Sequence, residues 1–310
     1  WDVSKVTLMS FMFSGASSFD QVLEWNTSSV THMDYMFQSA TSYNSPSGFI
    51  TSSVTNMEGM FARASAFNER IRSWDTSKVT NMNSMFYEAK AFNQAIGNWD
   101  TSKVTNMSYM FDNAESFNQD IGNWNTSLVS SMQFMFDQAY QFNQNIGNWN
   151  TGNVSTMEYM FSGASLFNQD LTGWCVNNIT SEPDSFAYLS ALTEENKPVW
   201  GKCPTSFSIN VTASSSSNYS LSGTDRNGNI SGSDPNLTFE VGDTINFEVN
   251  ASGHPFYLKT SAGTGTGNQI SGITNNGTTN QTISWTPTST GTFYYQCSLH
   301  GGMVGTITIQ

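Results

Sequence analysis

The sequence has few positive charges. Only 11 of its 310 residues are Lys or Arg, whereas 24 are Asp or Glu, and the formal net charge is −13. No stretch of the chain gathers basic side chains into a cluster or a stripe. Nucleic acids and anionic membranes are bound by basic surfaces, so the composition excludes both as partners.

Long apolar segments are missing as well. A membrane-spanning helix needs about 20 consecutive, mainly apolar residues, and no run in this chain approaches that length. We therefore predict no membrane span. No signal peptide is visible, but the chain opens at Trp1 inside a repeated pattern. We expect the N-terminus to be cut, so the missing signal says little about secretion.

Cysteine and histidine are scarce, with three of each. The few His residues form no Ser-His-Asp arrangement and no zinc-binding spacing, and no pair of carboxylates stands out. We therefore predict that the protein is not an enzyme.

An internal repeat of 24 or 25 residues fills the N-terminal part of the chain. Every copy contains a Met-x-x-Met-Phe segment, and together the copies use fourteen of the 15 Met; the fifteenth is Met303. Such a period is the signature of a repeat architecture. The seven copies begin at Trp1, Trp25, Phe49, Trp74, Trp99, Trp124 and Trp149.

The spacing within one copy predicts a short helix. In the fourth copy the apolar residues from Met82 to Ala89 occupy positions i, i+3, i+4 and i+7, the stripe of an amphipathic helix. Ile96, further along, is expected in a brief strand. A unit this small cannot bury its own apolar face, so the copies must stack. The sequence thus predicts an α/β solenoid over residues 1–174, with the Met pairs facing inward.

A second regular feature is a polar residue that follows an aromatic one in every copy. It is Asn in six copies and Asp20 in the first. We predict that these Asn form an internal ladder in which each side chain bonds a backbone group of a neighbouring turn. They are Asn44, Asn68, Asn93, Asn118, Asn143 and Asn168.

The repeat resembles the BspA-like leucine-rich-repeat surface proteins. The segment "NWDTSKVTNMSYMF…SFNQDIGNW" carries the resemblance, which covers residues 1–203. It implies a right-handed, leucine-rich-repeat-type solenoid of about seven repeats and an extracellular or cell-surface (secreted) location. It names no ligand. Adhesion is the role most often proposed for this group, so a protein or a glycan remains open as the ligand of the solenoid.

The repeat pattern stops after Trp174. The following segment, 175–203, is bounded by Cys175 and Cys203. An open solenoid end exposes apolar surface and strand edges, so we predict that this segment is the C-terminal cap. No His lies near the two Cys, which favours a Cys175–Cys203 disulfide over a metal site. A disulfide places the protein in an oxidising, extracytoplasmic compartment.

Residues 205–310 have a different composition, rich in Ser, Thr, Gly and Asn. Six segments alternate apolar and polar residues between Gly, Asn and Pro turns. This pattern predicts a separate all-β domain, an antiparallel sandwich. The segments are FSINVTA, LTFEVGDTINFEV, HPFYLKT, TISWTPT, TFYYQCSL and VGTITIQ.

The last Cys and the last Met lie in this domain. With the other two Cys paired in the cap, Cys297 has no partner, and an unpaired thiol in an oxidising compartment needs something that holds it as a thiolate. His300 and Met303 follow Cys297 closely, and His254 lies upstream. Two imidazoles, a thiolate and a thioether are the ligands of a mononuclear type 1 (blue) copper site. We predict one copper ion at this site.

The surroundings of the site follow from the same residues. We predict that Asn250 and Ser298 orient the ligands by hydrogen bonds. Leu299, Val304 and Phe256 are expected to form an apolar surround that keeps water from the thiolate.

Residues 205–310 resemble the cupredoxins. "GDTINFEVNASGHPFYLKT" is similar to the region of the first ligand and "TGTFYYQCSLHGGMVGTITI" to the ligand loop. Its Cys-x-x-His-x-x-Met spacing matches the short loop of amicyanin, whereas plastocyanin has a longer gap before its Met. The resemblance implies a cupredoxin-like Greek-key sandwich. The alternative is a cupredoxin fold that has lost its copper.

Three functions are compatible with these features. The sequence favours an extracellular copper-binding or electron-transfer protein, with a redox protein as partner and the solenoid as a docking or anchoring module. One alternative is an adhesion protein in which copper stiffens the β domain. The other is a self-assembling structural subunit of a surface appendage or virion. Multicopper oxidase chemistry is excluded, because such sites need several more His than the three present.

Overall fold

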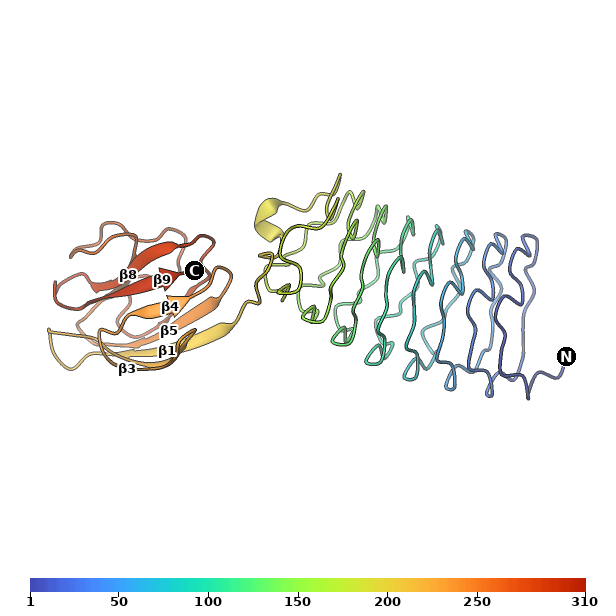
Figure 1. Cartoon of the computed structure of the whole chain (residues 1–310), viewed down its shortest axis with the longest axis horizontal. Helices are drawn as coiled ribbons and strands as arrows, with labels where there is room; N and C mark the ends of the chain where they lie inside the picture. Colours follow the sequence, from blue (N-terminus) through green and yellow to red (C-terminus); the bar gives the residue numbers. More distant parts are fainter. The chain divides into compact units, whose positions relative to one another are not determined.

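The computed structural model describes residues 1–310, which divide into the units Trp1–Gly201 and Lys202–Gln310. Each unit has a hydrophobic core of its own. The chain forms no helix with the length and apolar character needed to cross a membrane. Figure 1 labels the elements used below.

The first unit, here called the repeat unit, consists of stacked copies of one turn. Successive copies are joined by parallel bridges at the residue before the first Met of each copy; Asn81 pairs with Asn106, and Asn106 pairs with Ser131. Figure 1 shows the copies as successive turns of a coil. No α-helix occurs in them. The predicted α/β solenoid is therefore wrong in its helical part, and Ile96 lies outside the bridges.

Tight turns stand where the helix was predicted. In the fourth copy Met85 N donates to Met82 O at 3.2 Å, which closes a four-residue turn. Its third residue, Ser84, has a φ of 54°, a left-handed conformation that a right-handed helix does not contain. A second turn of the same kind follows, with Glu88 (φ 54°) at its third position.

The backbone amides explain why turns replace a helix. In a helix each amide donates to a carbonyl four residues earlier in the same segment. Here alternate amides donate to the next copy instead: Ser84 N donates to Ser108 O at 2.9 Å, and Phe86 N donates to Met110 O at 3.0 Å. Stacking therefore provides hydrogen-bond acceptors for backbone amides that would have none within an isolated copy.

The burial pattern of the turns is nevertheless the predicted one. In the fourth copy each turn buries its first and last residues and leaves its two middle residues partly exposed. Two consecutive turns thus produce the same i, i+3, i+4, i+7 spacing that indicates a helix. Every Met of the repeats is buried except Met12, which is 37% exposed. The prediction that the Met pairs face inward is confirmed for the other copies.

Two ladders run along the repeat unit. Asn93 Oδ1 accepts a hydrogen bond from Asn118 N, and Asn118 Oδ1 accepts one from Asn143 N, both at 3.0 Å. The same bond recurs in the other copies, so the predicted Asn ladder is confirmed. The second ladder consists of stacked Phe rings. The ring centroids of Phe86 and Phe111 are 5.7 Å apart, and the angle between the two ring planes is 7°.

The segment 175–203 accepts hydrogen bonds from the backbone amides of the last copy. The carbonyl groups of Asp184 and Phe186 accept hydrogen bonds from Tyr159 N (3.0 Å) and Phe161 N (2.8 Å). These are the bonds that a further copy would otherwise accept, as expected for a cap.

The cap contains one short helical turn and both cysteines of a covalent cross-link. The turn is the 3₁₀ helix η1, Glu194–Asn196, and Asn196 O accepts a hydrogen bond from Leu171 N at 2.9 Å. Cys175 and Cys203 are disulfide-bonded, as predicted.

The second unit, here called the β unit, contains nine strands in two sheets. One sheet has the order β3-β2-β1-β5-β7 and the other the order β4-β9-β8-β6. The strands are β1 (Ser206–Thr212), β2 (Ser220–Asp225), β3 (Gly228–Ser233), β4 (Leu237–Phe239), β5 (Thr244–Asn250), β6 (Phe256–Lys259), β7 (Thr282–Trp285), β8 (Gly291–Cys297) and β9 (Val304–Ile309).

Two strand pairs in the β unit are parallel. β1 runs parallel to β5, with Ser206 opposite Thr244, and β4 runs parallel to β9, with Leu237 opposite Ile307. The sandwich is therefore mixed, and the prediction of an antiparallel one is wrong at these pairs. Alternate residues of strands such as β1 and β5 face a common apolar core, as the predicted alternation of apolar and polar residues requires.

Candidate metal centre

The strand pairing brings the predicted ligands to one end of the β unit. Cys297 is the last residue of β8 and Val304 is the first of β9, so residues 298–303 form a short loop. β6 pairs with β8, and Phe256 lies opposite Cys297. His254 precedes Phe256 by two residues and is therefore held beside this loop.

The ligand atoms of three side chains converge there. His254 Nδ1 lies 3.2 Å from His300 Nδ1, and Cys297 Sγ lies 3.5 Å from His300 Nδ1. All three ligand atoms lie within 4.8 Å of one another, and no second group of His, Cys, Asp or Glu in the chain does so. In a hydrogen bond between the two Nδ1 atoms one atom donates and the other accepts, and the accepting nitrogen has the free lone pair that a metal ligand needs.

Cys297 is the free cysteine of the chain and is fully buried. A buried free Cys commonly behaves as a small apolar residue. The neighbours of Cys297 differ from those of such a residue, since an imidazole nitrogen lies at the distance given above. Both imidazoles are themselves only partly exposed.

The loop folds back on itself, so that the backbone of Met303 contacts the last residue of β8. Cys297 N donates to Met303 O at 3.0 Å, and Met303 N donates to His300 O at 3.3 Å. The Met303 side chain is fully buried in the apolar core of the β unit. Its role as a fourth ligand stays a prediction.

The donor set fits a metal ion of the copper type. Nitrogen ligands lie about 2.0 Å from a bound transition metal, so two of them at a tetrahedral or trigonal angle are roughly 3.3–3.5 Å apart. The separation of the two imidazole nitrogens, 3.2 Å, is close to that value. Two imidazoles with one thiolate are the equatorial ligands of blue-copper sites.

A glutamine that the sequence analysis missed organises the loop. Gln296 is 1% exposed, and its Nε2 donates to the carbonyl oxygens of Cys297 (3.2 Å), His300 (3.0 Å) and Met303 (3.1 Å). One side chain thus binds the backbone of three predicted ligands. No local pattern distinguishes this Gln from the others in the domain, because its role depends on how the loop folds back.

Replacing Gln296 by Leu is expected to weaken copper binding at least tenfold. The three carbonyl groups would lose the donor that ties them together, although His300 O and Met303 O each keep a backbone donor. An unsatisfied buried group costs about 1–3 kcal/mol, and outer contacts of this kind typically change metal affinity by about 10–100-fold. Competition with a chelator of known affinity measures the change. Gln281→Leu, at an exposed position, is the matched control and should bind copper as the parent does. Equal affinity of the two variants would contradict the role given to Gln296.

A buried tyrosine supports the other side of the site. Tyr219 is fully buried, and its hydroxyl lies within hydrogen-bond distance of His254 O (3.1 Å) and Pro255 O (2.9 Å). Burial, together with the neighbouring Cys297, raises the pKa of the Tyr219 hydroxyl, so it stays a donor at neutral pH. It fixes the turn that presents His254.

The other predicted neighbours have different positions. Asn250 is exposed at the end of β5, and neither it nor Ser298 makes a side-chain hydrogen bond to a predicted ligand; Ser298 contributes its carbonyl, which accepts from Gly265 N at 2.7 Å. Phe256 is buried as expected, whereas Leu299 is 63% exposed. Leu299 therefore does not shield the thiol, because it faces solvent.

The repeat unit matches a known protein family. Residues 1–98 and 91–200 match the family described as "Mycoplasma protein of unknown function, DUF285". The two matches together cover more than half of the 310 residues. No curated protein matches the chain.

Among solved structures, the copper protein rusticyanin is similar to part of this chain. The match has a TM-score of 0.25 and 20% sequence identity, and it covers 34% of this chain and 78% of rusticyanin. A score this low carries no argument about fold or metal. The assignment of a metal to the β unit therefore rests on the side chains described above.

Proposed function

Because the chain belongs to the DUF285 family of repeat proteins, we propose that it is a cell-surface or secreted protein with two functional parts. The repeat unit is a binding or anchoring module. The β unit is a cupredoxin-like Greek-key domain that holds a single type 1 copper ion and transfers electrons to a redox protein. The surface location is supported by the resemblance of the repeats to surface proteins and by the disulfide.

One observation carries the copper proposal. A buried free thiol and two imidazole nitrogens meet within 4.8 Å at one end of the β unit. His254, Cys297 and His300 would hold the ion, with Met303 as a weaker axial ligand. Bound copper would supply a one-electron Cu(II)/Cu(I) couple. The protein's contribution is to hold these ligands in place in both oxidation states, so that little rearrangement accompanies the electron.

We propose no catalytic role for the site. The third histidine of the chain, His32, lies in the repeat unit and bridges to Asn56 of the next copy. The β unit thus has no further imidazole for a second copper centre, and electron transfer needs none.

Titration with copper(II) tests this function. The full-length protein should bind one equivalent and develop the intense visible absorption of a thiolate–copper bond. His254→Asn should abolish the band. His32→Asn is the matched control, because other copies carry Asn at that position, and it should leave the band unchanged. A colourless parent protein, with its thiol demonstrably reduced, would refute the copper assignment.

Voltammetry separates electron transfer from the adhesion and structural alternatives. The copper-loaded protein is expected to show a reversible one-electron wave. If copper binds but cannot be reduced and reoxidised, the ion is a structural one and electron transfer is wrong.

A further inference from the structure

Outward-facing aromatic rings form a column along the repeat unit. Tyr109 stacks on Phe134 with centroids 4.7 Å apart, and Phe134 stacks on Tyr159 at 4.6 Å. The three residues occupy the same position in successive copies. Cavities of about 550 Å³ lie along this column, one beside Tyr109 and Phe134 and another beside Phe134 and Tyr159.

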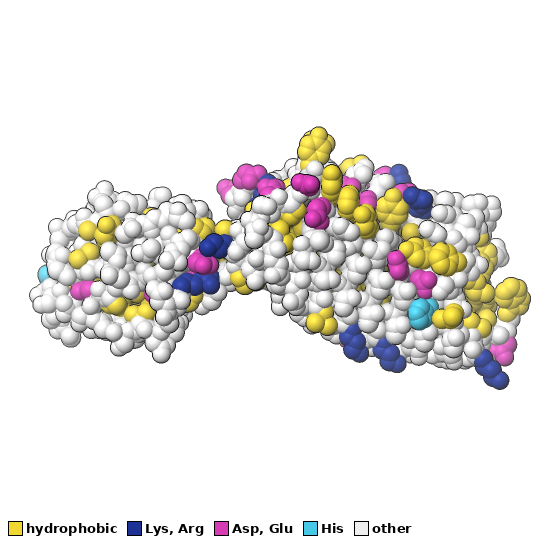
Figure 2. Space-filling view, in the orientation of Figure 1, with side chains coloured by type: hydrophobic (Ala, Val, Ile, Leu, Met, Phe, Trp, Pro, Cys, Tyr) yellow, Lys and Arg dark blue, Asp and Glu magenta, His cyan; other side chains and the backbone are white.

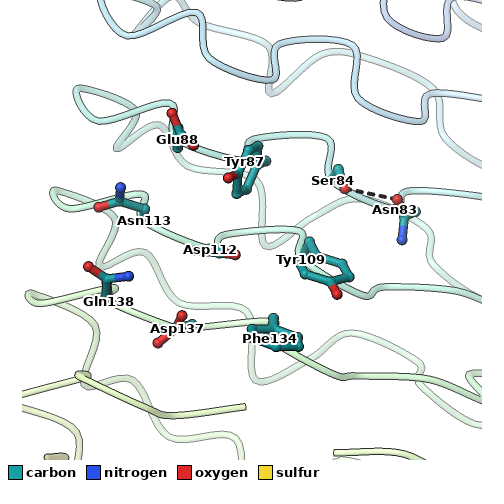
Figure 3. Close-up of a pocket in the computed structure, with 10 residues that line it drawn as sticks. All are labelled: Asn83, Ser84, Tyr87, Glu88, Tyr109, Asp112, Asn113, Phe134, Asp137 and Gln138. Carbon is teal, nitrogen blue, oxygen red and sulfur yellow. Dashed lines mark hydrogen bonds between the residues drawn. The ribbon is translucent and has the colours of Figure 1, made fainter. Parts of the chain in front are cut away.

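Two aspartates line the first cavity, and neither has a fully hydrogen-bonded carboxylate. Asp112 is only 7% exposed, and its carboxylate makes no hydrogen bond or ion pair. Asp137 Oδ1 is buried and has no hydrogen-bond partner, whereas Ser162 and Gln138 provide hydrogen bonds to this carboxylate that lower its pKa. Figure 3 shows both side chains on adjacent turns, next to Tyr109 and Phe134. We call this surface, formed by Asp112, Asp137, Tyr109, Phe134 and Tyr159, the acidic groove.

The acidic groove lowers the stability of the protein when no partner is bound. Burial and the neighbouring charges of Asp137 and Glu88 raise the pKa of Asp112 to about 7, and burial also raises the pKa of Asp137. A buried carboxylate without a partner, as at Asp112, or with one unpaired oxygen, as at Asp137, is unfavourable. No basic side chain of the repeat unit pairs with either aspartate, and Figure 2 shows acidic and hydrophobic side chains together on the visible face of this unit.

A metal ion does not fit these carboxylates. A hard cation requires several oxygen ligands around one point, and the acidic groove contains no group of three carboxylate ligands within 4.8 Å of one another. The cavity is also far larger than an ion. A larger organic cation that touches both rings and carboxylates fits better.

The repeat unit itself contains an organic cation bound in this way, the side chain of Arg63. Between the third and fourth copies, Arg63 Cζ lies 5.4 Å from the ring centroid of Tyr87, and Arg63 Nε lies 3.4 Å from Glu88 Oε1. There a guanidinium contacts an aromatic ring and a carboxylate of the next copy. At the acidic groove the corresponding copies have Asn113 and Gln138 in place of Arg63, so the acids face no internal cation.

We propose that the acidic groove binds an arginine side chain of a partner protein. The guanidinium would lie against the rings of Tyr109 and Phe134 and donate hydrogen bonds to Asp112 and Asp137. Arginine is favoured over lysine because its planar group stacks on aromatic rings and bonds carboxylates in two places. The proposal names a partner for the binding module and rests on that part of the proposed function only.

Binding of a hexa-arginine peptide to the full-length protein, measured by calorimetry at low ionic strength, tests this proposal. The double variant Asp112→Asn/Asp137→Asn should bind at least tenfold more weakly. The matched control is Asp75→Asn/Asp100→Asn, which changes the net charge equally at exposed positions and should retain the parent affinity. Hexa-citrulline, a neutral peptide of nearly the same shape, should not bind.

The affinity should also fall several-fold from pH 8 to pH 6. Asp112 loses its charge when it is protonated in this range; of the groups that face it, Asp137 and Glu88 are acids, and Tyr87 and Tyr109 are neutral hydroxyls with raised pKa. Equal weakening in both double variants, equal binding of the citrulline peptide, or no binding by the parent would each overturn the proposal. A failure of this kind leaves the copper titration unaffected.

Discussion

Met107→Asp is expected to unfold the repeat unit. Met107 is fully buried at the start of a turn in the fifth copy, and Asp would place an unpaired charge among apolar side chains. Loss of a buried Met side chain alone costs about 2–5 kcal/mol, and the buried charge adds to it. A small domain has only about 5–15 kcal/mol in total. In the variant, protease should therefore cleave the central copies, and their backbone amides should exchange faster than in the parent protein.

The measurement needs two comparisons, because a repeat protein can lose part of its stack. Met107→Leu keeps the volume and should cost less than about 1.5 kcal/mol. Leu128→Asp adds the same charge at a site that is 50% exposed and should change stability by at most about 0.5 kcal/mol. A Met107→Asp protein that melts at the parent temperature would mean that this Met does not face the core.

Cys297→Ser is expected to remove the visible band of the copper-loaded protein completely. The band arises from the thiolate, and a hydroxyl at the same position does not form an equivalent bond. The β unit itself should remain folded, since a buried hydroxyl without a partner costs about 1–3 kcal/mol. Amide exchange across β8 and β9 reports on the fold independently of the metal.

Met303→Leu is the companion variant. It removes the thioether from a fully buried position and keeps the apolar volume. The band should persist, and the reduction potential should rise because a donor that favours Cu(II) is gone. A Cys297→Ser protein that stays blue with copper would show that the colour comes from another group.

Much of the candidate centre was predictable because its ligands are close in sequence. Cys297, His300 and Met303 lie within one short loop, and only His254 must come from elsewhere. The count of three Cys left one thiol without a partner once the disulfide was assigned. Gln296 and Tyr219 were not predictable, because they act through backbone carbonyl groups that come near them only after folding.

The hairpin of β2 and β3 shows a similar limit. Its strands are rich in Ser and Gly and bury few residues, so alternation of apolar residues gives little signal. The run Asp225-Arg226-Asn227-Gly228 contains typical turn residues and was the available indication. The sheet supplies the stability that this local sequence lacks, since β2 also pairs with β1.

In the repeat unit, the sequence by itself determined the period, the number of copies and the side chains that face inward. It did not determine the backbone conformation. The spacing of Met82, Met85 and Phe86 reports which side chains are buried, and both a helix and a pair of tight turns satisfy it. Only the stacked structure decided between them, because alternate amides find their acceptors in the next copy, and no single copy contains those acceptors.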